Sequence, residues 1–415
     1  MSIDRRTRRH SDTRVLPPAS VRHDVLPGLL EEHGELAARG MASIGARPLT
    51  IVAADECFTV DRTSGHLSIR DGHNDAALEV AMEEEALSDA MQDVASLAWA
   101  AMMGRLTVER GTFDDLARWD PVLRTLRDGE PVFEPGTLAF SGLNGSPLDL
   151  RRAFRLDDEM AAAGSFLGQA GYVHLVEIFT SEEMDAVSAE LDDAVATAER
   201  DDGQSWWART ADGWYPARIL GFNRSSATLR ELLRSEKFLR LTALVEDDLV
   251  QADVEQSDMA EGLLKKIGVL EGISDVSWHK DCGPGGHTLG CSGLTVGIQL
   301  TAADRETGEL GVMAGSNRAN IPGLAPVQDF GLERVPLPTA KGDVTIHCSC
   351  TMHMSRPPVS AERRVVYTSL ALAPLPEDEY VRPSEDAKRS ERSALQDRVG
   401  QGVGSAREQQ TLGLD

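Results

Sequence analysis

The segment SWHKDC places a histidine and a carboxylate two positions apart, at His279 and Asp281. In a β-strand, residues i and i+2 point to the same face, so these two side chains reach one ion together while Lys280 points away. Two ligands hold a metal weakly, and a third is expected from another strand of the same sheet. We identify His353, at the far end of a strand that follows a Gly-Asp turn, as that third ligand.

Two histidines and one carboxylate form the facial triad of non-haem Fe(II) oxygenases, which leaves adjacent coordination positions open. An isolated H-x-D pair is a weak signal, but an arginine pair follows the second histidine and adds a cation to the constellation. The guanidinium fork of Arg364 suits a carboxylate bidentately. The competing interpretation is that Arg363 and Arg364 are simply the solvated end of a strand.

The cysteines offer a rival site of another class, a structural zinc. Four of them fall in the same half of the chain as the histidines, but no C-x-x-C pair occurs among them. Cys348 and Cys350 share one strand face with apolar residues, as buried small hydrophobic side chains do. The residues weighed for this site are Cys282, Cys291, Cys348 and Cys350.

Four further residues are candidates for the wall of a substrate pocket. His287 lies in the loop CGPGGHTLG just past the first two ligands, and His347 precedes the third. Trp214 belongs to an aromatic, Gly-interrupted span that suits either a lid or a core. Gln299, in the strand-like segment LTVGIQL, is the last candidate.

Residues 277–373 must position these groups. Their short alternating apolar runs, broken by Gly, Pro and Asn, indicate a β-sandwich or barrel. A helix near Asp157, the strand GYVHLVEIF and a helix capped by Thr180 or Ser181 are predicted before it. The predicted organisation is residues 1–21 disordered, 22–132 a first globular unit, 133–155 a linker, 156–376 the metal-binding domain and 377–415 a mobile tail.

Composition excludes some classes of partner. The chain has 415 residues and a net charge of -25, which repels nucleic-acid backbones and anionic membrane surfaces. No stretch has the roughly 18 apolar residues of a spanning helix, and the basic start lacks a signal-peptide core. Five cysteines in such a chain suggest reduced thiols. We therefore expect a cytoplasmic protein with a small-molecule partner and no membrane insertion, whereas composition says nothing of its oligomeric state.

From about residue 165 to 373 the sequence resembles the phytanoyl-CoA dioxygenase family of Fe(II)- and 2-oxoglutarate-dependent oxygenases. The segments that carry the resemblance are GQAGYVHLVEIFTSEEMDAVSAELD, WHKD, GELGVMAGSNRAN and GDVTIHCSCTMHMSRPPVSAERR. Where relatives have Pro-Gly-Ser-His, this chain has Ala-Gly-Ser-Asn at 314–317. The resemblance implies a C-terminal double-stranded β-helix, of the jelly-roll or cupin-like kind, with flanking helices.

The same resemblance implies the cofactors Fe(II), 2-oxoglutarate and O2. It places iron on His279, Asp281 and His353, and the distal 2-oxoglutarate carboxylate on Arg364 with Ser355. Because the carboxylate ligand is present, hydroxylation of an unactivated C–H bond is the expected reaction. Desaturation, epimerisation or cyclisation at the same iron site is the enzymatic alternative.

Residues about 45 to 130 resemble, more loosely, the sterol carrier protein family, a small α/β lipid-binding fold. The resemblance rests on the run DAALEVAMEEEALSDAMQDVASLAWAAMMGRLTVERGTFDDLARWDPVLRTL. The predicted fold class is thus α+β, and the fusion suggests an apolar or lipid-like substrate. A non-enzymatic lipid-binding protein, with the β-helix as a scaffold, is the alternative from another class.

Overall fold

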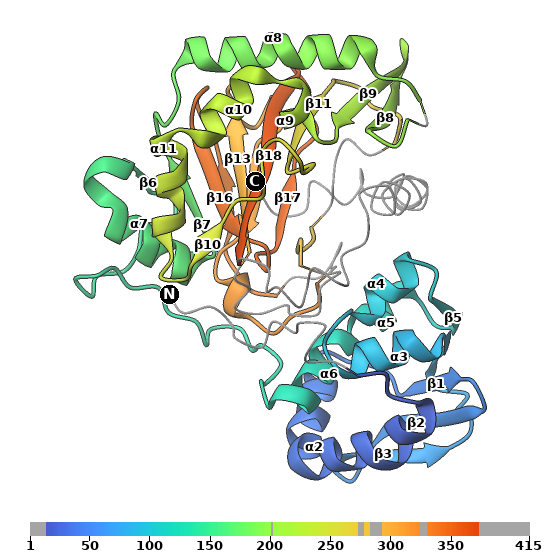
Figure 1. Cartoon of the computed structure of the whole chain (residues 1–415). Coiled ribbons are helices and arrows are strands. Elements are labelled where there is room, and N and C mark those ends of the chain that lie inside the picture. Colours follow the sequence, from blue (N-terminus) through green and yellow to red (C-terminus); the bar gives the residue numbers. More distant parts are fainter. Residues whose placement is uncertain (1–13, 201, 273–277, 283–292, 324–329, 373–415) are drawn as a thin grey trace.

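A computed structural model of the chain describes residues 14–200, 202–272, 278–282, 293–323 and 330–372 (Figure 1). Within these residues the strands form three sheets with helices packed beside them, so the fold is mixed α/β. The candidate His287 and the predicted tail 377–415 lie outside the described residues.

The N-terminal unit is built on a five-stranded sheet in the order β3-β2-β1-β4-β5. Its helices and sheet share one core, in which inward-facing strand residues such as Ile51 and Phe58 meet Trp119. The strands are β1 (Leu49–Ala53), β2 (Glu56–Thr63), β3 (His66–Asp71), β4 (Leu78–Met82) and β5 (Leu106–Arg110). The helices are α1 (Pro18–Ser20), η2 (Val21–Val25), α2 (Leu26–Ser43), α3 (Glu84–Met91), α4 (Leu97–Met102), α5 (Phe113–Ala117) and α6 (Trp119–Asp128).

Three details of this unit concern where its elements begin and end. The segment predicted to be disordered includes Leu16 and Val21, which are buried, so the ordered unit begins before residue 22. The helical run after β4 is divided in two because Asp93 adopts a positive φ and Ser96 caps α4 by accepting a hydrogen bond from the Trp99 amide. Pro121 lies in the first turn of α6, where its missing N–H costs nothing.

One enclosed space in this unit lies beside Asp93, Asp120, Arg124 and Arg127 and has a volume of about 10 Å³. A fatty-acyl chain does not fit such a space. The sterol-carrier resemblance therefore remains a prediction from sequence.

The C-terminal unit is built on a ten-stranded sheet in the order β12-β8-β9-β11-β18-β13-β16-β7-β6, with β10 paired to β18. A three-stranded sheet, β15-β14-β17, belongs to the same unit. The large sheet contains β6 (Ala153–Phe154), β7 (Tyr172–Leu175), β8 (Ser205–Thr210), β9 (Gly213–Ile219), β10 (Leu249–Val250), β11 (Ala260–Lys265), β12 (Glu271–Gly272), β13 (Leu294–Gln299), β16 (Val344–Cys348) and β18 (Arg363–Leu372). The small sheet contains β14 (Leu310–Met313), β15 (Arg334–Leu337) and β17 (His353–Ser355).

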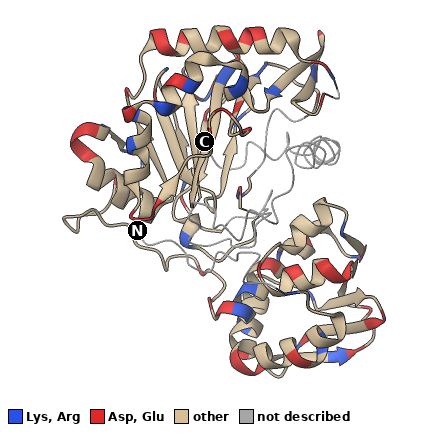
Figure 2. Cartoon of the chain, in the orientation of Figure 1, with Lys and Arg blue, Asp and Glu red and all other residues tan. Residues whose placement is uncertain are grey.

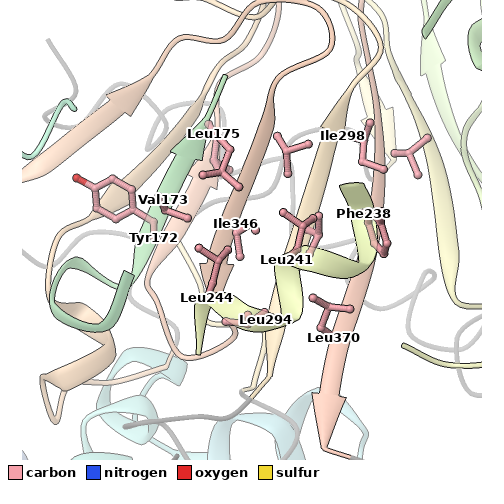
Figure 3. Close-up of a cluster of buried hydrophobic side chains, with 14 of the residues drawn as sticks. Tyr172, Val173, Leu175, Phe238, Leu241, Leu244, Leu294, Ile298, Ile346 and Leu370 are labelled. Atoms are coloured by element: carbon pink, nitrogen blue, oxygen red, sulfur yellow. The ribbon is translucent and has the colours of Figure 1, made fainter. Parts of the chain in front are cut away.

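Helices cover one face of the large sheet. Figure 3 shows Phe238, Leu241 and Leu244 of the covering helices against Ile298 and Ile346 of the strands. Because alternate residues of a strand point to opposite faces, the polar side chains of these strands can lie on the face that the helices do not cover. The covering helices are α7 (Leu156–Ala170), α8 (Ser181–Thr197), α10 (Ala227–Arg234), α11 (Glu236–Leu239) and η3 (Arg240–Leu244), and α9 (Phe222–Ser225) and η4 (Ser316–Arg318) complete the unit.

The predicted helix cap is confirmed at Thr180, whose side chain accepts from the Glu183 amide while the Glu183 carboxylate accepts from the Thr180 amide. The segment predicted as a linker, 133–155, contributes Leu150 and Phe154 to the C-terminal core. Its end forms β6, which pairs in parallel with β7.

Acidic side chains concentrate along α8, whose sequence contains six Asp and Glu residues and no Lys or Arg (Figure 2). Among the described residues, no helix is both long and apolar enough to span a bilayer.

Candidate metal centre

His279 and His353 lie opposite each other in an isolated antiparallel bridge. The His279 amide donates to the His353 carbonyl at 3.0 Å, and the His353 amide donates to the His279 carbonyl at 2.9 Å. Asp281 follows in a turn, not in the strand that the H-x-D spacing predicted. The turn still directs its carboxylate to the two imidazoles.

The three side chains converge on one point. Asp281 Oδ1 lies 3.4 Å from His279 Nε2 and 3.5 Å from His353 Nε2. One donor atom from each residue falls within 4.8 Å of the others, and among the described residues these three form the only such group. Cys282, Cys348 and Cys350 are buried in apolar surroundings and form no such cluster with described residues. Cys291 lies outside the described residues.

Neighbouring groups orient two of the three ligands. His353 Nδ1 lies 3.0 Å from the Thr351 carbonyl, which requires a proton on Nδ1 and leaves the Nε2 lone pair free. Asp281 Oδ2 accepts hydrogen bonds from Thr295 Oγ1 at 2.8 Å and from His347 Nε2 at 3.2 Å. Oδ1 is therefore the carboxylate oxygen that faces the two histidines.

The protonation states suit a cation. Burial alone would raise the pKa of Asp281, but the nearby His353 and the hydrogen bonds from His279 and His347 outweigh it and hold this pKa well below its usual value. Burial, followed by the neighbouring His347, lowers the pKa of His353 well below its usual value. An ionised carboxylate beside a neutral imidazole is the form in which both groups bind a metal.

This donor set fits a divalent metal with open coordination positions. Two imidazole nitrogens and one carboxylate oxygen are the ligands of non-haem Fe(II), and no cysteine of the described residues belongs to the group. The side chain of Asp281 is 32% exposed, and that of His353 is 9% exposed. The exposed side of the group faces a cavity, so further ligands have access to a bound ion.

The cavity has a volume of about 490 Å³ and is walled by both sheets. Polar side chains predominate on the described wall. Its lining residues are Arg218, Ala252, Ser257, Asp258, Met259, Glu261, Leu263, Lys265, His279, Asp281, Thr295, Leu310, His347, His353, Ser355, Arg363, Val365, Tyr367, Thr368 and Ser369.

Two buried cations meet at one part of this wall. Lys265 on β11 and Arg363 on β18 are direct cross-strand partners, and both are at most 2% exposed. Lys265 Nζ and Arg363 Nη1 both donate to Ser355 Oγ, at 2.8 Å and 3.0 Å. Arg363 also donates to the Gly308 carbonyl and to Gln299 Oε1, both of which are neutral. Like charges in direct register repel each other, so an anion placed between these two side chains would be stabilised by both.

The structure corrects the choice of arginine. Arg364 points away from the cavity and forms ion pairs with Asp192 and Glu362, and its Nη1 donates to Ser188 Oγ at 3.0 Å. The physical reason is the two-residue period of a strand, which puts Arg363 on the face of Val365 and Tyr367 and Arg364 on the other face. Arg363 therefore replaces Arg364 as the candidate, while Ser355 lies where the sequence interpretation expected it.

Two of the predicted substrate residues lie away from the cavity wall. Gln299 is fully buried behind Arg363 and holds its guanidinium. Trp214 is 38% exposed, and its ring lies under the guanidinium of Arg200, 4.1 Å from the ring centroid. Trp214 lines a separate surface hollow, so it is not a wall residue of the metal cavity.

Sequence reasoning missed Lys265, Thr295 and Tyr367, and it treated His347 as a filler or pocket wall, not as a hydrogen-bond partner of Asp281. Alternate residues of a strand share one face, so counting in steps of two from Val365 would have placed Arg363 and Tyr367 on that face. A lysine at the end of the apolar run AEGLLK was the signal for Lys265. No local signal marks Thr295, because its role depends on the pairing of β13 with β16.

The phytanoyl-CoA dioxygenase (PhyH) family model matches residues 167–366, the segment that contains the whole candidate site. No curated protein matches the chain. Solved structures that match part of this chain include AviO1 from Streptomyces viridochromogenes Tue57, with 21% identity, 54% of this chain and 100% of that chain covered, and a TM-score of 0.42.

Two others are the non-heme alpha ketoglutarate dependent epimerase SnoN from nogalamycin biosynthesis and EctD from S. alaskensis with 2-oxoglutarate and 5-hydroxyectoine. SnoN has 19% identity, covers 52% of this chain and 81% of its own, and has a TM-score of 0.42. EctD has 15% identity, covers 58% of this chain and 86% of its own, and has a TM-score of 0.42. Sequence identities and TM-scores this low give no information about the substrate of this chain.

Proposed function

We propose that this chain is a 2-oxoglutarate-dependent oxygenase that hydroxylates a C–H bond of a small molecule. Its residues 167–366 match the model of the phytanoyl-CoA dioxygenase family, whose cofactors are Fe(II), 2-oxoglutarate and O2. One observation carries the proposal. The donor atoms of His279, Asp281 and His353 converge at the wall of a cavity that also contains the buried cations Lys265 and Arg363.

His279, Asp281 and His353 hold the iron in this proposal. Thr295 and His347 keep Asp281 Oδ2 occupied with hydrogen bonds, so the carboxylate presents Oδ1 alone to the ion. The Thr351 carbonyl keeps the proton of His353 on Nδ1. When bound, iron and 2-oxoglutarate would supply the chemistry that activates O2 to oxidise a C–H bond.

Arg363, Lys265 and Ser355 hold the distal carboxylate of 2-oxoglutarate. Arg363 offers a charged fork that is already oriented by Gln299 and the Gly308 carbonyl, and Lys265 adds a second charge. Preorganised donors lose little side-chain entropy when the anion binds. The anion also relieves the repulsion between the two cations.

The described wall favours a substrate with several polar groups. Around the cavity, Arg218 is paired with Glu261 at 3.1 Å, and Tyr367 and Ser369 follow Arg363 at every second position of β18. A purely apolar substrate would displace the water around these polar groups without replacing its hydrogen bonds, which costs free energy. The expectation of a lipid-like substrate depended on the N-terminal resemblance and has no support from this wall.

The test is turnover of 2-oxoglutarate to succinate by the full chain with Fe(II) and O2. Wild type is expected to produce succinate even without a primary substrate, and the His353→Ala variant is expected to produce none. A pool of polar compounds should raise the turnover, whereas a pool of lipid-like compounds should not. Absence of succinate from wild type under all conditions would overturn the proposal and favour a scaffold protein.

Product mass distinguishes the possible reactions at the same site. Hydroxylation adds one oxygen, about 16 Da, whereas desaturation or cyclisation removes two hydrogens and epimerisation leaves the mass unchanged. A product heavier by one oxygen, labelled when ¹⁸O₂ is supplied, is the expected result. A stimulated turnover with no oxygen in the product would replace hydroxylation with one of the other reactions.

A further inference from the structure

The turn at Ser316–Asn320 touches three parts of the molecule at once, namely both segments that contain the metal ligands and helix α6 of the N-terminal unit. We propose that α6, through Asn320, holds this turn in place and thereby positions the metal ligands. Asn320 is then a positioning residue of the metal centre. This inference rests on the proposed iron site and adds a task for the N-terminal unit.

The turn supports both ligand segments directly. Lys280, between the ligands His279 and Asp281, is 2% exposed, and its Nζ donates to the carbonyls of Ser316 at 3.0 Å and Ala319 at 3.4 Å. The amide of Met352, which precedes His353, donates to Ser316 Oγ at 2.8 Å. A displacement of this turn therefore moves the backbone on both sides of the metal centre.

The same turn is attached to α6 by a buried amide. Asn320 is 1% exposed, and its Nδ2 lies within hydrogen-bond distance of the Pro121 carbonyl at 3.0 Å, the Glu130 carbonyl at 3.1 Å and Thr125 Oγ1 at 3.3 Å. The Phe133 amide donates back to the Asn320 carbonyl at 3.0 Å. Three acceptors around one NH2 group leave no freedom for this side chain to rotate.

The C-terminal unit also holds the turn, through Lys280 and Met352 and at the end of α7. Asn317 Nδ2 donates to the Gly168 carbonyl at 3.1 Å, and Arg318 Nε donates to the Gln169 carbonyl at 2.9 Å, both at the end of α7. Removing the Asn320 amide takes away the side-chain bonds between the turn and α6, and it leaves the Thr125 hydroxyl as the side-chain donor to the Pro121 and Glu130 carbonyls. Even a small shift of the ligand segments should weaken metal binding, because ligand distances must stay within about 0.2 Å of their preferred values.

The experiment measures Co(II) affinity of the full chain, with Co(II) as a redox-stable substitute for Fe(II) that reports by its visible absorption. Asn320→Ala and the milder Thr125→Val each remove part of the attachment. Both are expected to weaken Co(II) binding about three- to tenfold, less than the effect typical of direct neighbours of metal ligands. Thr50→Val is the matched control, because it removes a buried hydroxyl bonded to Thr59 at 2.8 Å elsewhere in the same unit.

Thermal unfolding of the same metal-free variants separates positioning from general stability. The control should lose stability with unchanged Co(II) affinity, whereas the two turn variants should lose affinity and change the absorption spectrum of bound Co(II). If Thr125→Val and Asn320→Ala lower the unfolding temperature but keep affinity within twofold of wild type, the inference is wrong and the iron site stands. If wild type binds no Co(II), both the inference and the proposed function fail.

Discussion

Lys265 and Arg363 lie side by side in register on β11 and β18, and both donate to the hydroxyl of Ser355. Two buried cations at one oxygen are costly unless an anion joins them. Both line the cavity of His279, Asp281 and His353, and this position supports the proposal that they bind the distal carboxylate of 2-oxoglutarate.

The adjacent arginines of β18 provide a matched pair of variants. Arg363→Met should weaken 2-oxoglutarate binding about 100-fold or more, because it removes one partner of a buried charge pair. Arg364→Met should stay within about threefold of wild type, since it removes only ion pairs outside the cavity, which contribute little. Titration of 2-oxoglutarate against the Co(II)-loaded protein measures both. Equal losses in the two variants would contradict the assignment of Arg363.

Thr295 should control metal affinity without binding the metal. Thr295→Val removes the shorter of the two hydrogen bonds to Asp281 Oδ2 and should weaken Co(II) binding about tenfold. Thr368→Val is the control, because Thr368 also lines the cavity but donates to the Met259 carbonyl. Unchanged affinity in Thr295→Val would show that His347 alone orients the carboxylate.

Asp120 should make stability depend on pH. Burial is the main cause that raises its pKa from 3.8 to about 7, and the hydrogen bond from the Leu97 amide opposes this only in part. A raised pKa means that the folded state holds its proton longer than the unfolded state, so stability is greatest at low pH and falls as pH rises toward and through 7. This residue alone should lower the free energy of unfolding by about 1 kcal/mol between pH 6 and pH 8.

Denaturant unfolding of wild type and Asp120→Asn at both pH values isolates that contribution. The asparagine variant retains an oxygen for the Leu97 amide but has no proton to lose. Its stability should change less over this range than that of wild type. An identical change in both proteins would show that Asp120 is not the responsible group.

Gly171 should tolerate no side chain. Its φ of 86° disfavours any Cβ, and an added Cβ would lie 2.5 Å from Thr351 Oγ1 and 2.7 Å from Asn317 Oδ1. Gly145 has a similar φ of 78° with no atom within 4 Å of such a Cβ. Gly145→Ala should therefore cost about 1 kcal/mol for backbone strain alone, and Gly171→Ala about 2 to 4 kcal/mol because the clash adds to it. Denaturant unfolding measures both, and equal costs would mean that the neighbours of Gly171 move away freely.

The cluster of His279, Asp281 and His353 could be predicted from sequence because residue type and spacing indicate it. An H-x-D segment, a later histidine and a serine two positions beyond it are local patterns, and their chemistry follows from the donor atoms. The cap of α8 at Thr180 was predicted for the same reason, since a helix start depends on a few neighbouring residues. The -25 net charge and the absence of a long apolar stretch likewise follow from composition alone.

Tertiary structure decided which of two adjacent arginines faces the cavity, because a shift of one residue in a strand exchanges its two faces. It also brought Lys265, Thr295 and His347 to the site through pairing between distant strands, which no local pattern encodes. The attachment of Asn320 to α6 depends on packing between Asn320 and Pro121, which lie 199 positions apart in the chain. Sequence determined the chemistry that this chain can perform, while long-range pairing determined which side chains surround that chemistry.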